Sequence, residues 1–117
     1  MKRGFFMGEL DLLNRPPNFE IAHTILFGRG ESVLLPDKPG IYFIHDFRGI
    51  LYIGRTENLK NRFHQHRWNC KNSRLREVIK QPIMDLKFSW MLINFPEQIQ
   101  KEKELISYFS PFCNFIK

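Results

Sequence analysis

The chain has 117 residues, about the size of one domain. Hydrophobic residues make up 43% of it, so a wholly disordered chain is excluded. The longest apolar runs fall far short of the roughly 18 residues that a membrane-spanning helix needs. Glu9 and Asp11 interrupt the basic, briefly apolar start before a secretory core can develop. We therefore expect a soluble, cytoplasmic protein without membrane contact.

Positive charge is concentrated in one part of the chain. Eighteen Lys and Arg residues against twelve Asp and Glu residues give a formal net charge of +6. Nine basic and two acidic residues between Arg48 and Lys80 give that segment a charge of +7. Such a segment in a compact domain is typical of proteins that bind a polyanion, most often nucleic acid. A solvated helix face that serves only solubility is the alternative.

The elements are hard to predict before residue 37. Residues 19–27 are apolar enough to pack on the main body, but their pattern fits a strand and a short helix equally well. We treat residues 1–36 as an N-terminal extension and residues 37–117 as the domain.

A β-hairpin and a helix open the domain. Residues 40–45 and 50–53 are β-branched and aromatic runs joined by a turn that contains glycine, which predicts a hairpin. Thr56 is placed to cap a helix that runs to about Trp68, with Glu57 in its first turn.

Two further helices and a strand complete the domain. A helix is expected from about residue 72 to 81, and a buried strand at residues 86–93. Pro96 suits the first turn of a last helix, which reaches about Phe109. The order β-β-α-α-β-α predicts a small α+β fold, with a three-stranded antiparallel sheet flanked by helices.

Two groups of residues suggest chemistry. Tyr42 and Tyr52 occupy the two strands of one hairpin, each beside Ile and Gly, although tyrosine is also an ordinary strand residue. Arg62 and His66 are one helical turn apart and share a face. Together with Arg55 near the start of that helix, they could hold a phosphate. A solvated basic face is the alternative, and it gives no reason for the imidazole.

An acid also lies in the apolar stripe of the last helix. At 100° per residue from Ile99, Leu105 and Ile106 fall at about 240° and 340°. Glu102 falls at about 300°, in the middle of that stripe. A carboxylate there is costly unless it is paired, hydrogen-bonded or bound to a metal.

A zinc site is not favoured. His64, His66 and Cys70 are ligands that zinc accepts, but structural zinc normally has four ligands in paired spacings. Cys70 and Cys113 form no C-x-x-C motif, and a cytosolic setting would keep both as thiols.

The motifs together resemble the GIY-YIG nuclease superfamily. Gly40-Ile41-Tyr42 and Tyr52-Ile53-Gly54 match the two halves of its signature. The resemblance extends over residues 39–114 and includes, in order, Arg55, Arg62, His66, Glu102 and Asn114.

The resemblance implies hydrolysis of a nucleic-acid phosphodiester with one divalent metal, Mg²⁺, for which Mn²⁺ can substitute. Glu102 would be the metal ligand, and Arg62 would hold a phosphate oxygen. Tyr42 would be the leading base, with Tyr52 and His66 in support. Which of these three activates the water stays open. The catalytic set is Tyr42, Tyr52, Arg55, Arg62, His66 and Glu102, supported by Gly54 and Asn114.

The expected substrate is DNA, with RNA less favoured, in a repair, recombination or mobile-element context. Cleavage would be directed by DNA structure, or a protein partner would supply targeting. The residues expected to contact nucleic acid are Arg48, Lys60, Arg67, Lys71, Arg74 and Arg76. A binding module that keeps the fold without turnover is the alternative, and an adaptor for an acidic protein is a third. The intact catalytic pattern favours the nuclease.

Overall fold

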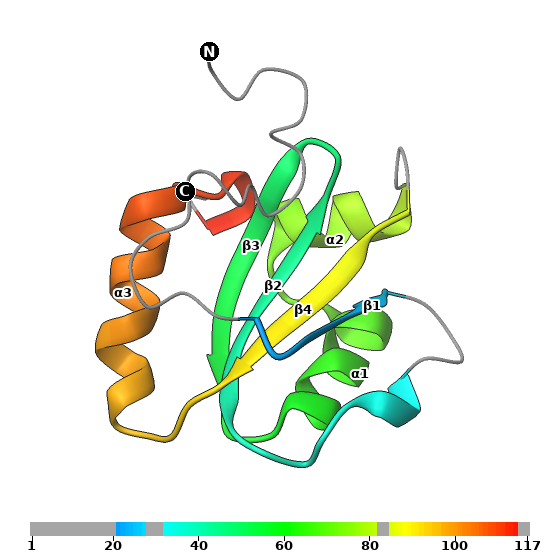
Figure 1. The fold of residues 1–117 in the computed structure, drawn as a ribbon. Helices are drawn as coiled ribbons and strands as arrows, with labels where there is room; N and C mark the ends of the chain where they lie inside the picture. Colours follow the sequence, from blue (N-terminus) through cyan, green and yellow to red (C-terminus); the bar gives the residue numbers. More distant parts are fainter. Residues whose placement is uncertain (1–20, 28–31, 82–84, 115–117) are drawn as a thin grey trace.

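The structure is a computed structural model that describes residues 21–27, 32–81 and 85–114 (Figure 1). In chain order its elements are β1 (His23–Leu26), the short 3₁₀ helix η3 (Ser32–Leu34), β2 (Gly40–Asp46), β3 (Gly49–Thr56), α1 (Leu59–Asn69), α2 (Ser73–Lys80), β4 (Lys87–Leu92), α3 (Glu97–Phe109) and η4 (Phe112–Asn114). The α+β class predicted from the sequence is confirmed. Within these described ranges, every helix is too short or too polar to cross a membrane.

The sheet has four antiparallel strands in the order β1-β4-β2-β3. The hairpin of β2 and β3 and the pairing of β2 with β4 give the three predicted strands. The fourth, β1, comes from the N-terminal extension, where Ile25 pairs with Phe88. The prediction was one strand short because the pattern of residues 19–27 did not decide between strand and helix. Only pairing with the distant β4 decides it.

Helices cover both faces of the sheet (Figure 1). α1 and α2 pack on the face that carries Tyr42 and Phe88, where Phe63 joins the larger hydrophobic cluster. α3 packs on the other face, where Leu105 contacts the smaller cluster around Phe43. Successive residues of a strand point to opposite faces, so every residue of the central strand β2 is buried.

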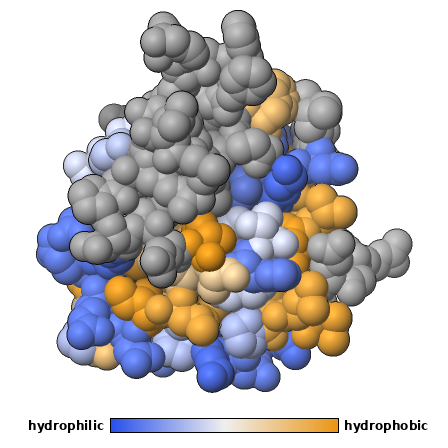
Figure 2. Space-filling view, viewed as in Figure 1, coloured by the Kyte–Doolittle hydropathy of each residue, from blue (hydrophilic) through white to orange (hydrophobic). Residues whose placement is uncertain are grey.

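The surface seen in Figure 2 is mixed. Hydrophilic residues follow the outer side of α3, and an exposed hydrophobic group lies at the position of η3. Val33 and Leu34, both in η3, are 75% and 55% exposed. Exposed apolar residues such as these are normal on the surface of a folded domain.

The start of α1 differs from the prediction. Thr56 does not cap the helix because β3 runs on to Thr56, which pairs with Gly40. Asn58 is the N-cap, and its side-chain oxygen accepts a hydrogen bond from the N–H of Asn61 at 2.9 Å. Glu57 therefore lies outside the first turn. The Thr56 hydroxyl accepts from the Asn58 N–H at 3.1 Å and so shapes the turn into the helix.

The later boundaries lie close to the predicted ones. Asn72 caps α2, and its side-chain oxygen accepts from the N–H of Leu75 at 2.9 Å. β4 falls inside the predicted strand. Pro96, expected in the first turn of the last helix, is instead the N-cap residue of α3, which starts one residue later at Glu97, and Ser110 ends the helix in a left-handed conformation with φ 48°.

Candidate active site

The predicted catalytic residues meet at the β3 edge of the sheet. Tyr42 comes from β2, Tyr52 and Arg55 from β3, Arg62 and His66 from α1, and Glu102 from α3. β3 is an edge strand, α3 packs beside it, and α1 lies on the opposite face of the sheet against β2 (Figure 1). Residues far apart in the sequence therefore come from two adjacent strands and from helices on both faces of the sheet.

Three rings form the inner part of the site. The hydroxyl of Tyr42 lies 2.7 Å from Nε2 of His66, and both residues are buried. The ring of Tyr52 lies 6.1 Å from that of Tyr42 and 5.6 Å from that of His66, between ring centroids. Tyr42 is wholly buried whereas Tyr52 is partly exposed. Tyr52 is therefore the ring nearer to solvent.

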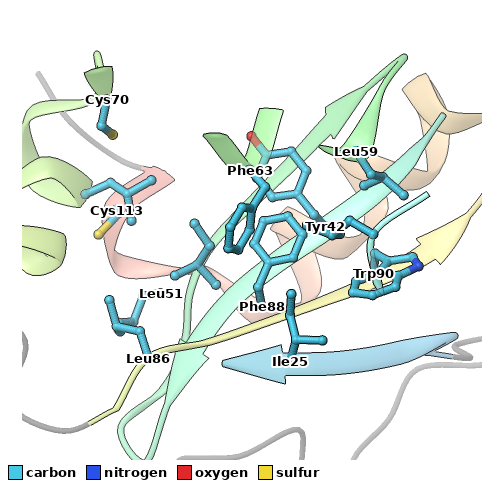
Figure 3. Packing of buried hydrophobic residues seen from close by; sticks show 13 residues of the cluster. Ile25, Tyr42, Leu51, Leu59, Phe63, Cys70, Leu86, Phe88, Trp90 and Cys113 are labelled. Atoms are coloured by element: carbon cyan, nitrogen blue, oxygen red, sulfur yellow. The ribbon is translucent and has the colours of Figure 1, made fainter. Parts of the chain in front are cut away.

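The hydrophobic core holds Tyr42 in place. Its ring stacks on Phe88 with 5.3 Å between centroids. Figure 3 shows the ring among the apolar side chains of the larger cluster, which also contains Phe63. An aromatic ring packed in this way has little freedom to turn.

The two glycines of the signature make room for close packing. Gly54 pairs with Tyr42 across the hairpin, and a Cβ there would overlap the phenol ring of Tyr42. At Gly40, a Cβ would collide with the carbonyl oxygen of Met91 in β4. Gly54 therefore serves the site directly, because it lets the Tyr42 ring cross the strand backbone.

An ion pair and a second arginine form the outer part of the site. Nε of Arg55 lies 3.2 Å from Oε1 of Glu102, and both side chains are partly exposed. Arg62 donates to the carbonyl oxygen of Arg55 at 3.4 Å and to Oε1 of Gln65 at 2.8 Å. Arg55 and Arg62 line a cleft of about 350 Å³ beside the start of α1, together with Thr56, Glu57, Asn58, Asn61, Gln65 and Gln98.

Burial sets the protonation of the inner groups. It raises the pKa of Tyr42, helped by the neighbouring Tyr52, whereas Arg62 acts in the opposite direction. Burial, and then Arg62, lower the pKa of His66 to about 4. At neutral pH the phenol therefore keeps its proton and the imidazole is neutral. Tyr42 can then donate its hydroxyl hydrogen to His66.

Two opposing effects act on the pKa of Glu102, and burial is the larger of them. Burial raises the pKa of Glu102, and the charge of Arg55 acts against that rise. Burial and then the Glu102 charge also raise the pKa of Tyr52. A cation bound near Glu102 would lower the raised pKa values of both Glu102 and Tyr52, because it favours the charged forms of nearby acids.

The donor set fits a hydrated Mg²⁺ ion. Within the described ranges, no group of three or more His, Cys, Asp or Glu side chains could hold a metal. Mg²⁺ keeps several waters and needs only one or two carboxylates, which Glu102 can supply. Gln98, one turn earlier on α3, has a buried Oε1 without a hydrogen-bond partner. Such an oxygen suits a metal-bound water.

Sequence reasoning missed Gln98. Its Nε2 donates to the carbonyl oxygens of Ile93 at 3.0 Å and Thr56 at 3.3 Å, which fixes the amide and turns Oε1 away from them. At 100° per residue from Ile99, Gln98 falls at about 260°, in the same apolar stripe as Glu102. Its position four residues before Glu102 was the available signal.

Asn114 completes the edge of β3. Its Oδ1 accepts from the N–H of Ile53 and its Nδ2 donates to the carbonyl oxygen of Ile53, both at 2.8 Å. The side-chain amide thus takes the place of a neighbouring strand next to Tyr52. Asn114 thus anchors η4 to β3. Among the described contacts, none joins Asn114 to a predicted catalytic side chain.

The six basic residues expected to contact nucleic acid come from several elements, namely α1, α2, the loop between them and the turn between β2 and β3. At about 100° per residue, Lys60 and Arg67 lie roughly 150° around α1 from Arg62. Arg67 lines a separate hollow of about 420 Å³ with residues that include Ile79 and Leu86. Lys71 is exposed just after α1.

The other three arginines make contacts within the protein. Arg48 forms an ion pair with the buried Asp46. The guanidinium of Arg74 lies 4.5 Å from the ring centroid of Phe112 and donates to its carbonyl oxygen at 3.0 Å. Arg76 donates to the carbonyl oxygen of Cys70 at 3.0 Å.

Comparison with protein families gives one match that spans most of the chain. The family described as the GIY-YIG catalytic domain matches residues 38–114. UvrABC system protein C from Mycoplasma mycoides subsp. mycoides is 34% identical over 84 residues, which is 71% of this chain and 14% of that protein. The protein of the same name from Lactobacillus gasseri is 34% identical over 83 residues, 69% of this chain and 13% of that protein. The chain thus spans about a seventh of these relatives.

Solved structures give the same fold. The GIY-YIG N-terminal endonuclease domain of UvrC from Thermotoga maritima, bound to its catalytic divalent cation, magnesium, superposes with a TM-score of 0.60. It is 22% identical, and the match covers 73% of this chain and 92% of that one. A tyrosine-to-phenylalanine variant of that domain, bound to its catalytic divalent cation, matches with the same TM-score.

Proposed function

Because the chain belongs to the GIY-YIG catalytic domain family, we propose that it is a divalent-metal-dependent endonuclease that hydrolyses DNA phosphodiester bonds. One observation carries the proposal: at one sheet edge, the buried Tyr42–His66 pair lies beside Arg62 and the Arg55–Glu102 ion pair. This arrangement combines a proton acceptor, a phosphate-binding cation and a carboxylate that can hold a metal.

In this proposal Glu102 binds the divalent ion, which is Mg²⁺ or a substituting Mn²⁺. Gln98 would lie close to the water molecules bound to that ion. The ion would neutralise charge on the phosphate and on the leaving oxygen. Arg55 now pairs with Glu102, and once the carboxylate has another partner its guanidinium is free for the substrate. Arg62 holds a phosphate oxygen from the cleft that it lines.

In this proposal the rings of Tyr42, Tyr52 and His66 orient the attacking water and accept its proton. Tyr52 is partly exposed and orients the attacking water. Tyr42, behind it, receives the proton of that water as its own passes to Nε2 of His66, 2.7 Å away. A free phenolate is not required, which agrees with the raised pKa of Tyr42. Arg62 stabilises the negative charge that develops on the phenol oxygen.

We place this activity in DNA repair with cleavage directed by DNA structure, since the relatives named above are components of the UvrABC system. The chain spans only a small part of those proteins. A partner that brings it to its substrate is therefore part of the proposal. Branched, flapped and mismatched duplexes are the substrates to compare.

The deciding experiment is nicking of supercoiled plasmid with Mg²⁺, with Mn²⁺ and with EDTA, using wild type, Glu102→Ala and Glu104→Ala. Glu104 is exposed on the same helix and contacts only Gln100 among the contacts described, so it is a matched control. We expect metal-dependent nicking that falls at least about 100-fold in Glu102→Ala and persists in Glu104→Ala. Full activity in Glu102→Ala would refute the metal assignment. Salt-sensitive DNA binding without nicking, on plasmid and on branched DNA alike, would instead support a binding module.

A further inference from the structure

On the side of the imidazole opposite Tyr42, the neighbour of His66 is Cys70, which is not part of the family signature. Nδ1 of His66 lies 3.4 Å from Sγ of Cys70, and that sulfur lies 3.7 Å from the carbonyl oxygen of Asn72. Cys70 is the C-cap residue of α1 and only 7% exposed. It follows His66 by one helical turn, so both side chains face the sheet.

These contacts determine where the hydrogens lie. A carbonyl oxygen only accepts, so the thiol hydrogen of Cys70 points at Asn72. The sulfur then presents lone pairs to His66, and Nδ1 must carry the hydrogen between them. A neutral imidazole has a single N–H. Nε2 is therefore the acceptor, and the Tyr42 hydroxyl donates to it.

The protonation of the three groups agrees with this chain of hydrogen bonds. Burial raises the pKa of Cys70 and of Tyr42, so both keep their hydrogens. Burial lowers the pKa of His66 to about 4, so its ring is neutral near pH 7. Each hydrogen then has one acceptor, in the order Tyr42, His66, Cys70 and Asn72.

We propose that Cys70 is a positioning residue that fixes the tautomer of His66 and so keeps Nε2 facing Tyr42 as a proton acceptor. The inference rests on the proposed function, because only a hydrolytic reaction uses that acceptor. The bond from the water oxygen to phosphorus forms, and the bond from phosphorus to the leaving oxygen breaks. The water proton goes to Tyr42, the Tyr42 proton goes to Nε2, and the leaving oxygen takes a proton from solvent. His66 later returns its proton to solvent.

The opposite tautomer cannot perform this step. With its hydrogen on Nε2, His66 would donate to Tyr42, and the phenol would have no base beside it. Free histidine in water favours that opposite tautomer. An acceptor at Nδ1 is therefore needed to hold the productive form, as with histidines whose second ring nitrogen is fixed by a neighbour.

The test measures the tautomer of His66 directly, by long-range ¹H–¹⁵N NMR of the protein labelled with ¹⁵N-histidine. His66 is distinguished from the other histidines by the signals that disappear in His66→Gln. We expect wild type to show a protonated Nδ1 and an unprotonated Nε2. Cys70→Ala removes the acceptor and should move the Nε2 signal toward that of a protonated nitrogen.

Two variants control for packing. Cys70→Ser keeps a hydrogen-bonding group that can donate to Asn72 and accept from Nδ1, so it should preserve the wild-type tautomer. Cys113→Ala removes the other buried thiol, which belongs to the same hydrophobic cluster. It should also leave the tautomer unchanged. In plasmid nicking, Cys70→Ala should lose about 10- to 100-fold in rate, with DNA binding retained and Cys70→Ser restoring most of the rate.

The proposal and the nuclease function fail in different ways. A protonated Nε2 in wild-type His66 would overturn the positioning role without any variant, as would Cys70→Ala with an unchanged tautomer. If no metal supports nicking, but Cys70→Ala still shifts the tautomer, the nuclease proposal fails and what stands is that Cys70 fixes the tautomer of His66. A circular dichroism melt of each variant shows whether it is folded.

Discussion

Replacing Gly54 by alanine tests the close packing between the β3 backbone and the catalytic ring. The new Cβ would lie 2.5 Å from Cζ and 2.8 Å from Cε1 of Tyr42, distances that real Cβ atoms do not reach. The ring cannot turn aside easily, because it stacks on Phe88 and its hydroxyl is bonded to His66. Overpacking of a buried site costs about 1–3 kcal/mol, and we expect about 2 kcal/mol of unfolding free energy here.

That loss corresponds to a fall in Tm of roughly 8 °C for a domain of this size, measured by circular dichroism, with urea unfolding as the independent measure. The Tyr42 ring should be displaced from His66, so nicking should fall more steeply than stability. In a Tyr42→Phe background the overlap with the hydroxyl is gone, and Gly54→Ala should cost less. A Gly54→Ala chain with wild-type Tm and wild-type nicking would refute the argument that Gly54 makes room for the ring.

Two further predictions concern charge. Because burial lowers the pKa of His66 to about 4 in the folded state, against about 6.5 in the unfolded chain, the unfolded state binds the extra proton. The contribution of His66 to the free energy of unfolding should not change with pH above about 6.5. As the pH falls from 6.5 to 4, the free energy of unfolding should fall by up to about 3 kcal/mol, measured by urea unfolding. His66→Gln should flatten that part of the profile, and an unchanged slope would contradict the assignment. Arg48→Ala leaves the buried Asp46 carboxylate without its ion-pair partner and should cost about 1–3 kcal/mol, with little effect on DNA affinity in a filter-binding assay. A large loss of affinity with unchanged Tm would instead make Arg48 a DNA contact.

The features that sequence predicted well depend on neighbours in the chain. The hairpin follows from two β-branched runs around a turn, and both ends of α2 follow from Asn72 and the proline after Gln81. Glu102 could be singled out because helical periodicity alone places it among apolar side chains. In each case the physical cause, a backbone preference or a repeat along one helix, acts within a few residues.

The features that sequence missed depend on residues brought together by folding. Whether residues 23–26 form a strand is decided by pairing with β4, and the start of α1 by how far β3 extends along β2.

The amino-acid sequence by itself determined the fold class, the order of the later elements and the residue types available for catalysis. Only the tertiary structure decided that Cys70 lies against His66, that the side-chain oxygen of Gln98 is buried without a hydrogen-bond partner, and that Gly54 makes room for Tyr42. These relations involve distances between side chains on different elements or on successive turns at a buried face. Packing of the whole core sets such distances, and no local pattern encodes them.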